Sequence, residues 1–253
     1  MSRSSAVLVE RPRAVPQSAP TRAPRTARGA PRSILVRSDV SCLFGFILTA
    51  WTFASGFLPE TDPGQPPPAY WIAGSAGALA VLASLLAHEL GHLLAARRAG
   101  LHVARLTLSF AGGRLEIPGA IRFPHQELVI AMGGPIASAL VMVIAAVSHV
   151  LIVETYGPGL PATVLALVAA ANLALLLFNA IPGWPLDGGR GLRAVIWALT
   201  RRPDLATHVA QTIGRRVGEA MIVIAAVGSA FGFVGIAIWA AFLGLIVRDS
   251  AYA

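Results

Sequence analysis

The stretch Ala87-His-Glu-Leu-Gly-His-Leu-Leu-Ala95 decides the fold, because it places ionisable residues inside an otherwise apolar segment. That segment, from about Tyr70 to Ala96, is long enough to cross a bilayer as a helix. On a helix, His88 and His92 share one face because they are four residues apart, and Glu89 lies beside that face. Ionisable residues within a membrane span are costly and usually functional.

Two imidazoles in this arrangement can bind one Zn²⁺, and the adjacent glutamate can take a proton from water at the metal. The alternative is a set of polar residues that satisfy one another inside a helix bundle, which the cost of burying them disfavours. We therefore predict that His88 and His92 bind one zinc ion per chain and that Glu89 is the catalytic base.

The composition of the 253-residue chain predicts a multi-pass membrane protein. Hydrophobic residues make up 55% of the chain and charged residues 13%, against about 25% charged residues in soluble domains. All 20 basic residues are Arg, which favours a bacterial origin. The net charge of +8 does not indicate nucleic-acid binding, because the Arg residues flank apolar segments and form no patch with aromatic residues.

We expect an all-α membrane domain over residues 34–253 with about six transmembrane helices. Four spans are predicted at about Val40–Leu58, Tyr70–Ala96, Leu128–Val153 and Ala162–Ile181. The last apolar run, Ala220–Val247, has 28 residues and would form a single helix of about 42 Å. It is longer than one span needs and contains three glycines, so we expect a hairpin of two short helices, with one span as the alternative.

The Arg residues orient the chain. Six spans, with the N-terminus in the cytoplasm, place every Arg on the cytoplasmic side, as the positive-inside rule requires. Both termini are then cytoplasmic, in a multi-pass protein of the cell membrane. Residues 1–33, rich in Arg and Pro, are expected to be a disordered cytoplasmic tail, with an organellar transit peptide as the alternative.

A β-hairpin is predicted between the second and third spans. Apolar and polar residues alternate from Leu101 to Phe110, and a glycine-containing turn leads into Arg114–Ile117. The hairpin lies at the cytoplasmic membrane boundary. It either holds an unwound substrate strand by edge pairing or only packs against the helices.

Catalytic zinc needs a third protein ligand. Glu116, His102 and Glu127 are near in sequence, but the stronger candidate is Asp187, in the segment Asn179–Arg190. This segment follows the fourth span on the same side as His92, and its prolines and glycines interrupt a regular helix. Irregular backbone at a membrane is tolerated where it lines a cavity. A simple turn at Asp187-Gly188 is the alternative.

Together, His-Glu-Leu-Gly-His at 88–92, Gly133-Gly134-Pro135 and Asn-Ala-Ile-Pro-Gly-Trp-Pro-Leu-Asp-Gly-Gly-Arg at 179–190 resemble the site-2 protease family of intramembrane zinc metalloproteases. The resemblance covers about residues 40–248 and is nearest to the branch of the sporulation factor protease, without an inserted PDZ or cystathionine-synthase-like domain. It implies that His88, His92 and Asp187 are zinc ligands and that Glu89 is the catalytic base. It also implies that a set of further residues seats the substrate: Gly134, Pro135, Asn179 and Pro182.

The function expected from this resemblance is hydrolysis of single-span membrane proteins near the cytoplasmic face of the bilayer. Substrates implied by the family are membrane-bound anti-sigma factors, pro-sigma factors and signal-peptide remnants. Three alternatives stay open: a peptidase that clears hydrophobic peptides, a non-catalytic membrane scaffold and a zinc transporter. The partners expected are a transmembrane substrate and the lipid bilayer, and the oligomeric state is left open.

Overall fold

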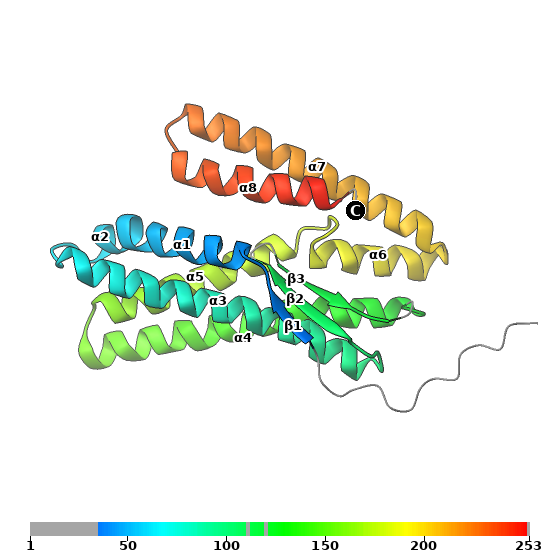
Figure 1. The fold of residues 1–253 in the computed structure, drawn as a ribbon, viewed down its shortest axis with the longest axis horizontal. Coiled ribbons are helices and arrows are strands. Elements are labelled where there is room, and N and C mark those ends of the chain that lie inside the picture. The colour runs from blue at the N-terminus through cyan, green and yellow to red at the C-terminus, as the bar shows by residue number, and fades with distance from the viewer. Residues whose placement is uncertain (1–34, 110–111, 119–120, 252–253) are drawn as a thin grey trace, which may run out of the picture. The chain divides into compact units, whose positions relative to one another are not determined.

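The computed structural model describes residues 35–109, 112–118 and 121–251 (Figure 1). The predicted tail of residues 1–33 lies outside these ranges, as do Phe110 and Ala111 at the predicted hairpin turn. In chain order, the elements are β1 (Leu35–Ser38), α1 (Ser41–Thr52), the π-helical turn η1 (Phe53–Phe57), α2 (Leu58–Thr61), α3 (Pro67–Arg98), β2 (Arg105–Ser109), β3 (Gly112–Glu116), α4 (Pro124–Tyr156), α5 (Leu160–Asn179), α6 (Asp187–Thr200), α7 (Pro203–Ala230) and α8 (Val234–Ser250).

Four helical segments in the described part of the chain are long and apolar enough to cross a membrane: Ser41–Thr61, α3, α4 and α5. Each overlaps one of the four predicted spans. Helices α3, α4 and α5 begin with proline in the first turn, where its fixed φ favours a helix and its missing N–H costs nothing. Helix α4 ends at Gly157, whose φ of 84° suits a residue without a side chain.

The last apolar run forms a helical hairpin, as predicted, but its two helices are unequal. Helix α7 begins at Pro203, well before the apolar run, and its middle carries Arg215, Arg216 and Glu219. Helix α8 has only 17 residues. Neither is among the four segments that are long and apolar enough to span, so the prediction of six transmembrane helices is not confirmed.

A three-stranded sheet stands where a two-stranded hairpin was predicted. Strand β2 pairs antiparallel with β3, as expected, and on its other side it pairs in parallel with β1. The four-residue strand β1 was missed because it is short and precedes the first span without alternation of its own. Both sides of β2 are therefore occupied, so an incoming strand cannot pair along residues 105–108. Within this sheet the unpaired edges belong to β1 and β3.

The sheet lies against α3, which itself packs on α4. A buried apolar cluster of Leu93, Ala96, Val103 and Ile130 joins the two helices, with Leu115 of β3 packed on it. Near this cluster Gly91 of α3 faces Gly133 of α4, and a Cβ on either glycine would overlap the backbone of the other. The close approach of these helices brings the histidine face of α3 against α4.

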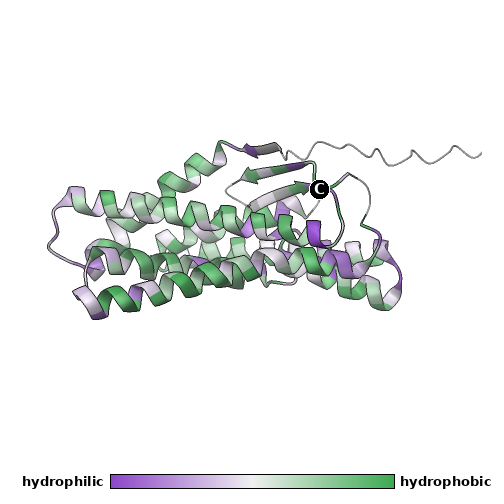
Figure 2. Ribbon diagram, turned by 90° about the horizontal axis from the view of Figure 1, so that it is seen from below, coloured by the Kyte–Doolittle hydropathy of each residue, from purple (hydrophilic) through white to green (hydrophobic). Residues whose placement is uncertain are grey.

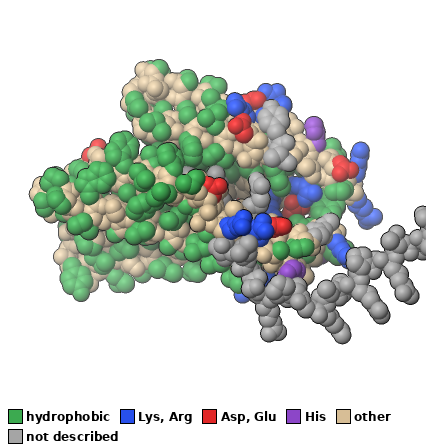
Figure 3. All heavy atoms as spheres, viewed as in Figure 1, with side chains coloured by type: hydrophobic (Ala, Val, Ile, Leu, Met, Phe, Trp, Pro, Cys, Tyr) green, Lys and Arg blue, Asp and Glu red, His purple; other side chains and the backbone are tan. Residues whose placement is uncertain are grey.

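Charged side chains gather around the sheet and α6. Figure 3 shows hydrophobic side chains over most of the helical surface, with Arg and acidic side chains gathered near the sheet. Figure 2 shows the same division along the ribbons, with hydrophilic residues mainly toward the end of the bundle that carries the sheet. This separation is typical of a membrane protein with its polar end at one face of the bilayer.

Candidate metal centre

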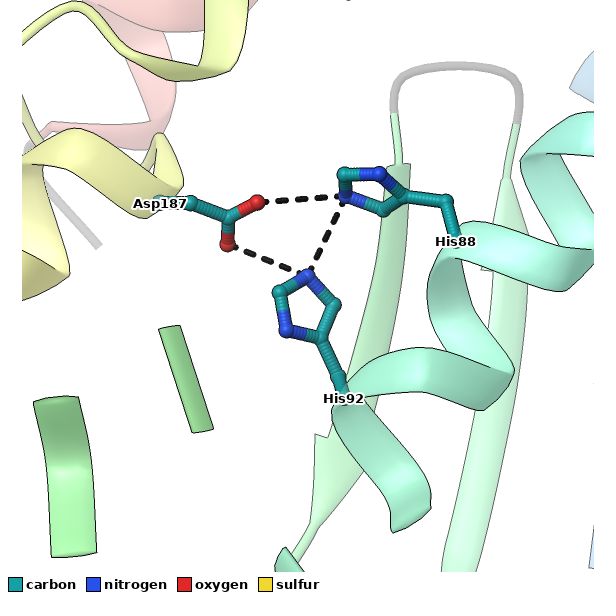
Figure 4. A group of neighbouring side chains, drawn as sticks. All are labelled: His88, His92 and Asp187. Carbon is teal, nitrogen blue, oxygen red and sulfur yellow. Dashed lines mark hydrogen bonds and ion pairs between the residues drawn. The ribbon is translucent and has the colours of Figure 1, made fainter. Parts of the chain in front are cut away.

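Three buried side chains from two distant segments converge at one point (Figure 4). The Nε2 atoms of His88 and His92 lie 3.2 Å apart, and each lies 3.1 Å from an oxygen of Asp187. The exposed fractions are 3% for His88, 4% for His92 and 8% for Asp187. Ligand atoms that share one tetrahedral zinc lie about 3.3 Å apart, since zinc–nitrogen bonds are about 2.0–2.1 Å. The donor set therefore fits a zinc ion.

Helix α3 presents both imidazoles on one face, and α4 fixes their orientation. Nδ1 of His92 lies 2.7 Å from the carbonyl oxygen of Ile130, which can only accept, and this short contact favours a proton on Nδ1 although the Gly134 N–H approaches the same nitrogen at 3.3 Å. As a neutral metal ligand, His92 would keep this proton on Nδ1 and offer the lone pair of Nε2, which faces Asp187. Nδ1 of His88 lies 2.9 Å from the hydroxyl of Ser138. Metal-binding histidines are oriented in this way by a second partner on the other ring nitrogen.

Gly134 leaves room for the ligand nitrogens. A Cβ at this position of α4 would overlap Nε2 of both His88 and His92. The helix continues through Pro135, and Gly134 lines the site. Any larger residue at 134 would displace the two imidazoles.

Asp187 is the first residue of α6 and follows the irregular segment 180–186. That segment is held against α7, because Trp184 N–H donates to the carbonyl of Ala210 at 3.0 Å and Gly214 lies in contact with the Trp184 backbone. Burial by itself raises the pKa of Asp187, but the hydrogen bonds to His88 and His92 outweigh it and hold the pKa below its ordinary value. Asp187 is therefore an ionised carboxylate, as a metal ligand must be.

Glu89 is also buried, with 4% exposed, and the sheet holds its carboxylate. Gly113 N–H of β3 donates to Oε1 of Glu89 at 2.6 Å, and a Cβ at Gly113 would overlap the carboxylate. The hairpin thus positions the residue next to His88. This contact could not be predicted, since nothing in the alternation of the strands marks Gly113 as a partner of Glu89.

The other candidate ligands lie away from the centre. Glu116 is 59% exposed and pairs with Arg105 at 3.4 Å, and His102 is exposed. Glu127 is buried, but it is bound to Arg193. Among the described residues, His88, His92 and Asp187 form the group with metal-binding geometry.

The residues expected to seat a substrate are spread around the centre. Gly134 faces the histidines, while Pro135 is half-buried in the same helix. Asn179 ends α5, where its Nδ2 donates to the Leu175 carbonyl at 3.0 Å, and Pro182 is exposed in the segment before Asp187. Their role toward a substrate stays a prediction.

Comparison with known proteins agrees with this geometry. Residues 155–225, which include Asp187, match peptidase family M50. The chain is 39% identical over 208 residues to the putative zinc metalloprotease Rip3 of Mycobacterium tuberculosis, covering 81% of this chain and 52% of that protein. It is 35% identical over 173 residues to the putative zinc metalloprotease sll0528 of Synechocystis, covering 67% of this chain and 43% of that protein. It thus spans about half the length of these relatives or less.

The fold also matches a solved structure, the site-2 protease from Methanocaldococcus jannaschii. The TM-score is 0.60 with 22% identity, over 88% of this chain and 92% of that one. All three motifs that carried the resemblance in the sequence contribute to one buried centre in a fold of this kind. The chain is thus homologous to zinc metalloproteases, matches peptidase family M50 around Asp187, and has the fold of a site-2 protease.

Proposed function

We propose that this chain is an intramembrane zinc metalloprotease that hydrolyses peptide bonds of transmembrane substrates near the cytoplasmic face of the membrane. The observation that carries the proposal is the convergence of His88, His92 and Asp187 beside the buried carboxylate of Glu89. A scaffold that only retained the fold would not need three ligand atoms within bonding range of one cation together with a buried glutamate.

The residues have distinct roles in this proposal. The zinc would be held by His88, His92 and Asp187. It would act as a Lewis acid that makes water more acidic and polarises the scissile carbonyl. Glu89 takes the proton from the attacking water and passes it to the leaving amine. The Gly113 N–H fixes the carboxylate of Glu89 for both transfers.

The substrate must present an extended strand, because helical hydrogen bonds hide its peptide groups. Residues 105–108 are already paired on both sides, so β3 offers the edge nearest to Glu89. We propose that the unwound substrate pairs with β3. Gly134, Pro135, Asn179 and Pro182 are proposed to line its path.

The membrane orientation proposed from the sequence is the same for four spans as for six. Four spans, like six, return the chain to its starting side, and the α7–α8 hairpin brings Arg248 back beside Gly218. With the N-terminus cytoplasmic, the sheet, α6 and most Arg residues face the cytoplasm of a bacterial cell. Membrane-bound anti-sigma factors, pro-sigma factors or signal-peptide remnants are the proposed substrates.

The test is cleavage of a designed single-span helix, tagged on its cytoplasmic side, in liposomes that contain the purified chain. We expect cleavage by the zinc-loaded wild type, loss on chelation and recovery with added zinc. Glu89→Gln should retain zinc but cleave about 10²–10⁴-fold more slowly. A zinc-loaded wild type that cleaves none of a panel of such helices would favour the scaffold. Equal cleavage by Glu89→Gln would remove the proposed base.

A further inference from the structure

A buried ion pair joins α4 to α6 outside the metal centre. Glu127 of α4 is 2% exposed, and its Oε2 is bound by Nη1 of Arg193. The Arg193 side chain is itself 20% exposed. Taking two charges out of water costs several kcal/mol for each ion, and their attraction recovers this only with good geometry and further hydrogen bonds.

Arg193 has those further contacts. Its Nε donates to the hydroxyl of Thr207 on α7 at 2.7 Å, and its guanidinium lies 5.6 Å from the centre of the Trp197 ring. The Thr207 hydroxyl donates in turn to the Pro203 carbonyl at 2.9 Å, so its oxygen is oriented to accept from Arg193. One planar guanidinium thus ties three helices together in a fixed direction.

Glu127 and Arg193 are both close in sequence to residues that form or orient the metal centre. Glu127 lies one helical turn before Ile130, whose carbonyl orients His92. Arg193 lies six residues after Asp187 on α6. Thr207 lies one turn before Ala210, whose carbonyl holds the segment that leads into Asp187. The bridge therefore connects the helix that orients the histidines with the helix and segment that carry the third ligand.

We propose that Glu127 and Arg193 are positioning residues that set Asp187 at bonding distance from the metal held by His88 and His92. This proposal rests on the proposed function, because it assumes that the centre binds zinc. Asp187 lies in the first turn of α6, directly after an irregular segment, whereas both histidines lie within the regular helix α3. Loss of the bridge should loosen the third ligand while leaving the other two in place.

The test compares four variants of the full-length purified chain: Arg193→Met, Glu127→Gln, the double variant and Arg193→Lys. Zinc affinity is measured by chelator competition, the cobalt(II) absorption spectrum reports ligand geometry, and thermal unfolding reports the fold. Arg216→Gln is the control, since it removes an equal charge from an exposed pair with Glu219 on α7.

Each single neutral variant should bind zinc about tenfold more weakly, and its unfolding temperature should fall because one charge is left buried without a partner. The double variant should recover the unfolding temperature, since no unpaired charge remains, but keep the weak zinc binding and an altered cobalt(II) spectrum. Arg193→Lys should keep the charge and the fold yet lose part of the affinity, because a single ammonium cannot reach both partners. Arg216→Gln should match the wild type.

Wild-type zinc affinity and spectrum in the double variant would overturn the positioning role and leave the pair as a purely structural bridge. That result is distinct from failure of the proposed function, in which the wild type binds zinc and cleaves no substrate. If the two single neutral variants do not fold, the double variant and Arg193→Lys still test the positioning role. A wild type that binds neither zinc nor cobalt(II) would overturn both proposals.

Discussion

The metal centre is assembled from two regions that obtain their geometry in different ways. His88 and His92 come from one regular helix, where a spacing of four residues alone puts both imidazoles on one face. Asp187 comes from the end of an irregular segment 99 residues after His88, and its place depends on contacts with α7 and α4. One half of the site is thus fixed by local structure and the other by tertiary packing.

This difference indicates which part of the site is most easily displaced by substitutions elsewhere in the chain. Changes outside the site should leave the histidine pair in place, because a helix inside a bundle holds it. Substitutions in α7 should displace Asp187, because the backbone of the segment before it is closely packed against the backbone of α7. The predictions below separate the two regions, beginning with the largest effect.

Removing a ligand from the regular region should abolish the site. We expect His92→Ala to lower zinc affinity by more than about 100-fold, since even partners that only orient a ligand contribute about 10–100-fold. Cleavage should fall to background. The exposed His125 provides a matched control, and His125→Ala should leave zinc content and cleavage unchanged. Retention of zinc by His92→Ala would mean that this histidine is not a ligand.

A substitution in α7 should disturb only the irregular segment that leads into Asp187. In Gly214→Ala, the new Cβ would overlap the carbonyl of Trp184, so the segment before Asp187 must shift. We expect zinc affinity to fall about tenfold and the free energy of unfolding to fall by about 1–3 kcal/mol. Gly228→Ala in the same helix is the control, because its Cβ would meet no atom nearer than 4.0 Å. Equal zinc affinity in both variants would show that α7 does not support Asp187.

The smallest expected effect separates zinc binding from catalysis. In Gly113→Ala, the Cβ would displace the carboxylate of Glu89 without touching the ligands. We expect about tenfold slower cleavage, because a small misplacement of a catalytic group lowers the rate, and unchanged zinc content. Gly235→Ala, which meets nothing within 4 Å, is the control. A parallel loss of zinc and cleavage would mean that the sheet supports the whole centre.

Local patterns in the sequence were sufficient for much of this structure. The four long helices, the β2–β3 hairpin and the metal-binding potential of His88 and His92 follow from hydropathy, alternation and helical spacing. Asp187 could be chosen over Glu116 because topology puts the end of the fourth span on the side of His92. In the structure Asp187 lies beside His88 and His92, and Glu116 is paired with Arg105 at the surface.

The features that could not be predicted depend on contacts between distant residues. Strand β1 pairs with β2, 70 residues away in the register Leu35–Arg105. The contact of Gly113 with Glu89 and the bridge between Glu127 and Arg193 leave no trace in local composition. Six spans were expected because the apolar run Ala220–Val247 is longer than one span needs, but α8 has only 17 residues, fewer than a typical span of about 20.

The most direct test of the central claim is the zinc content of the purified wild type beside that of Asp187→Ala. If one zinc ion is held jointly by the helical histidines and the distant carboxylate, the wild type should contain about one zinc per chain. The variant should contain far less, with its helical content unchanged by circular dichroism. Equal zinc content in the two proteins would contradict the account, because Asp187 would then not be the third ligand.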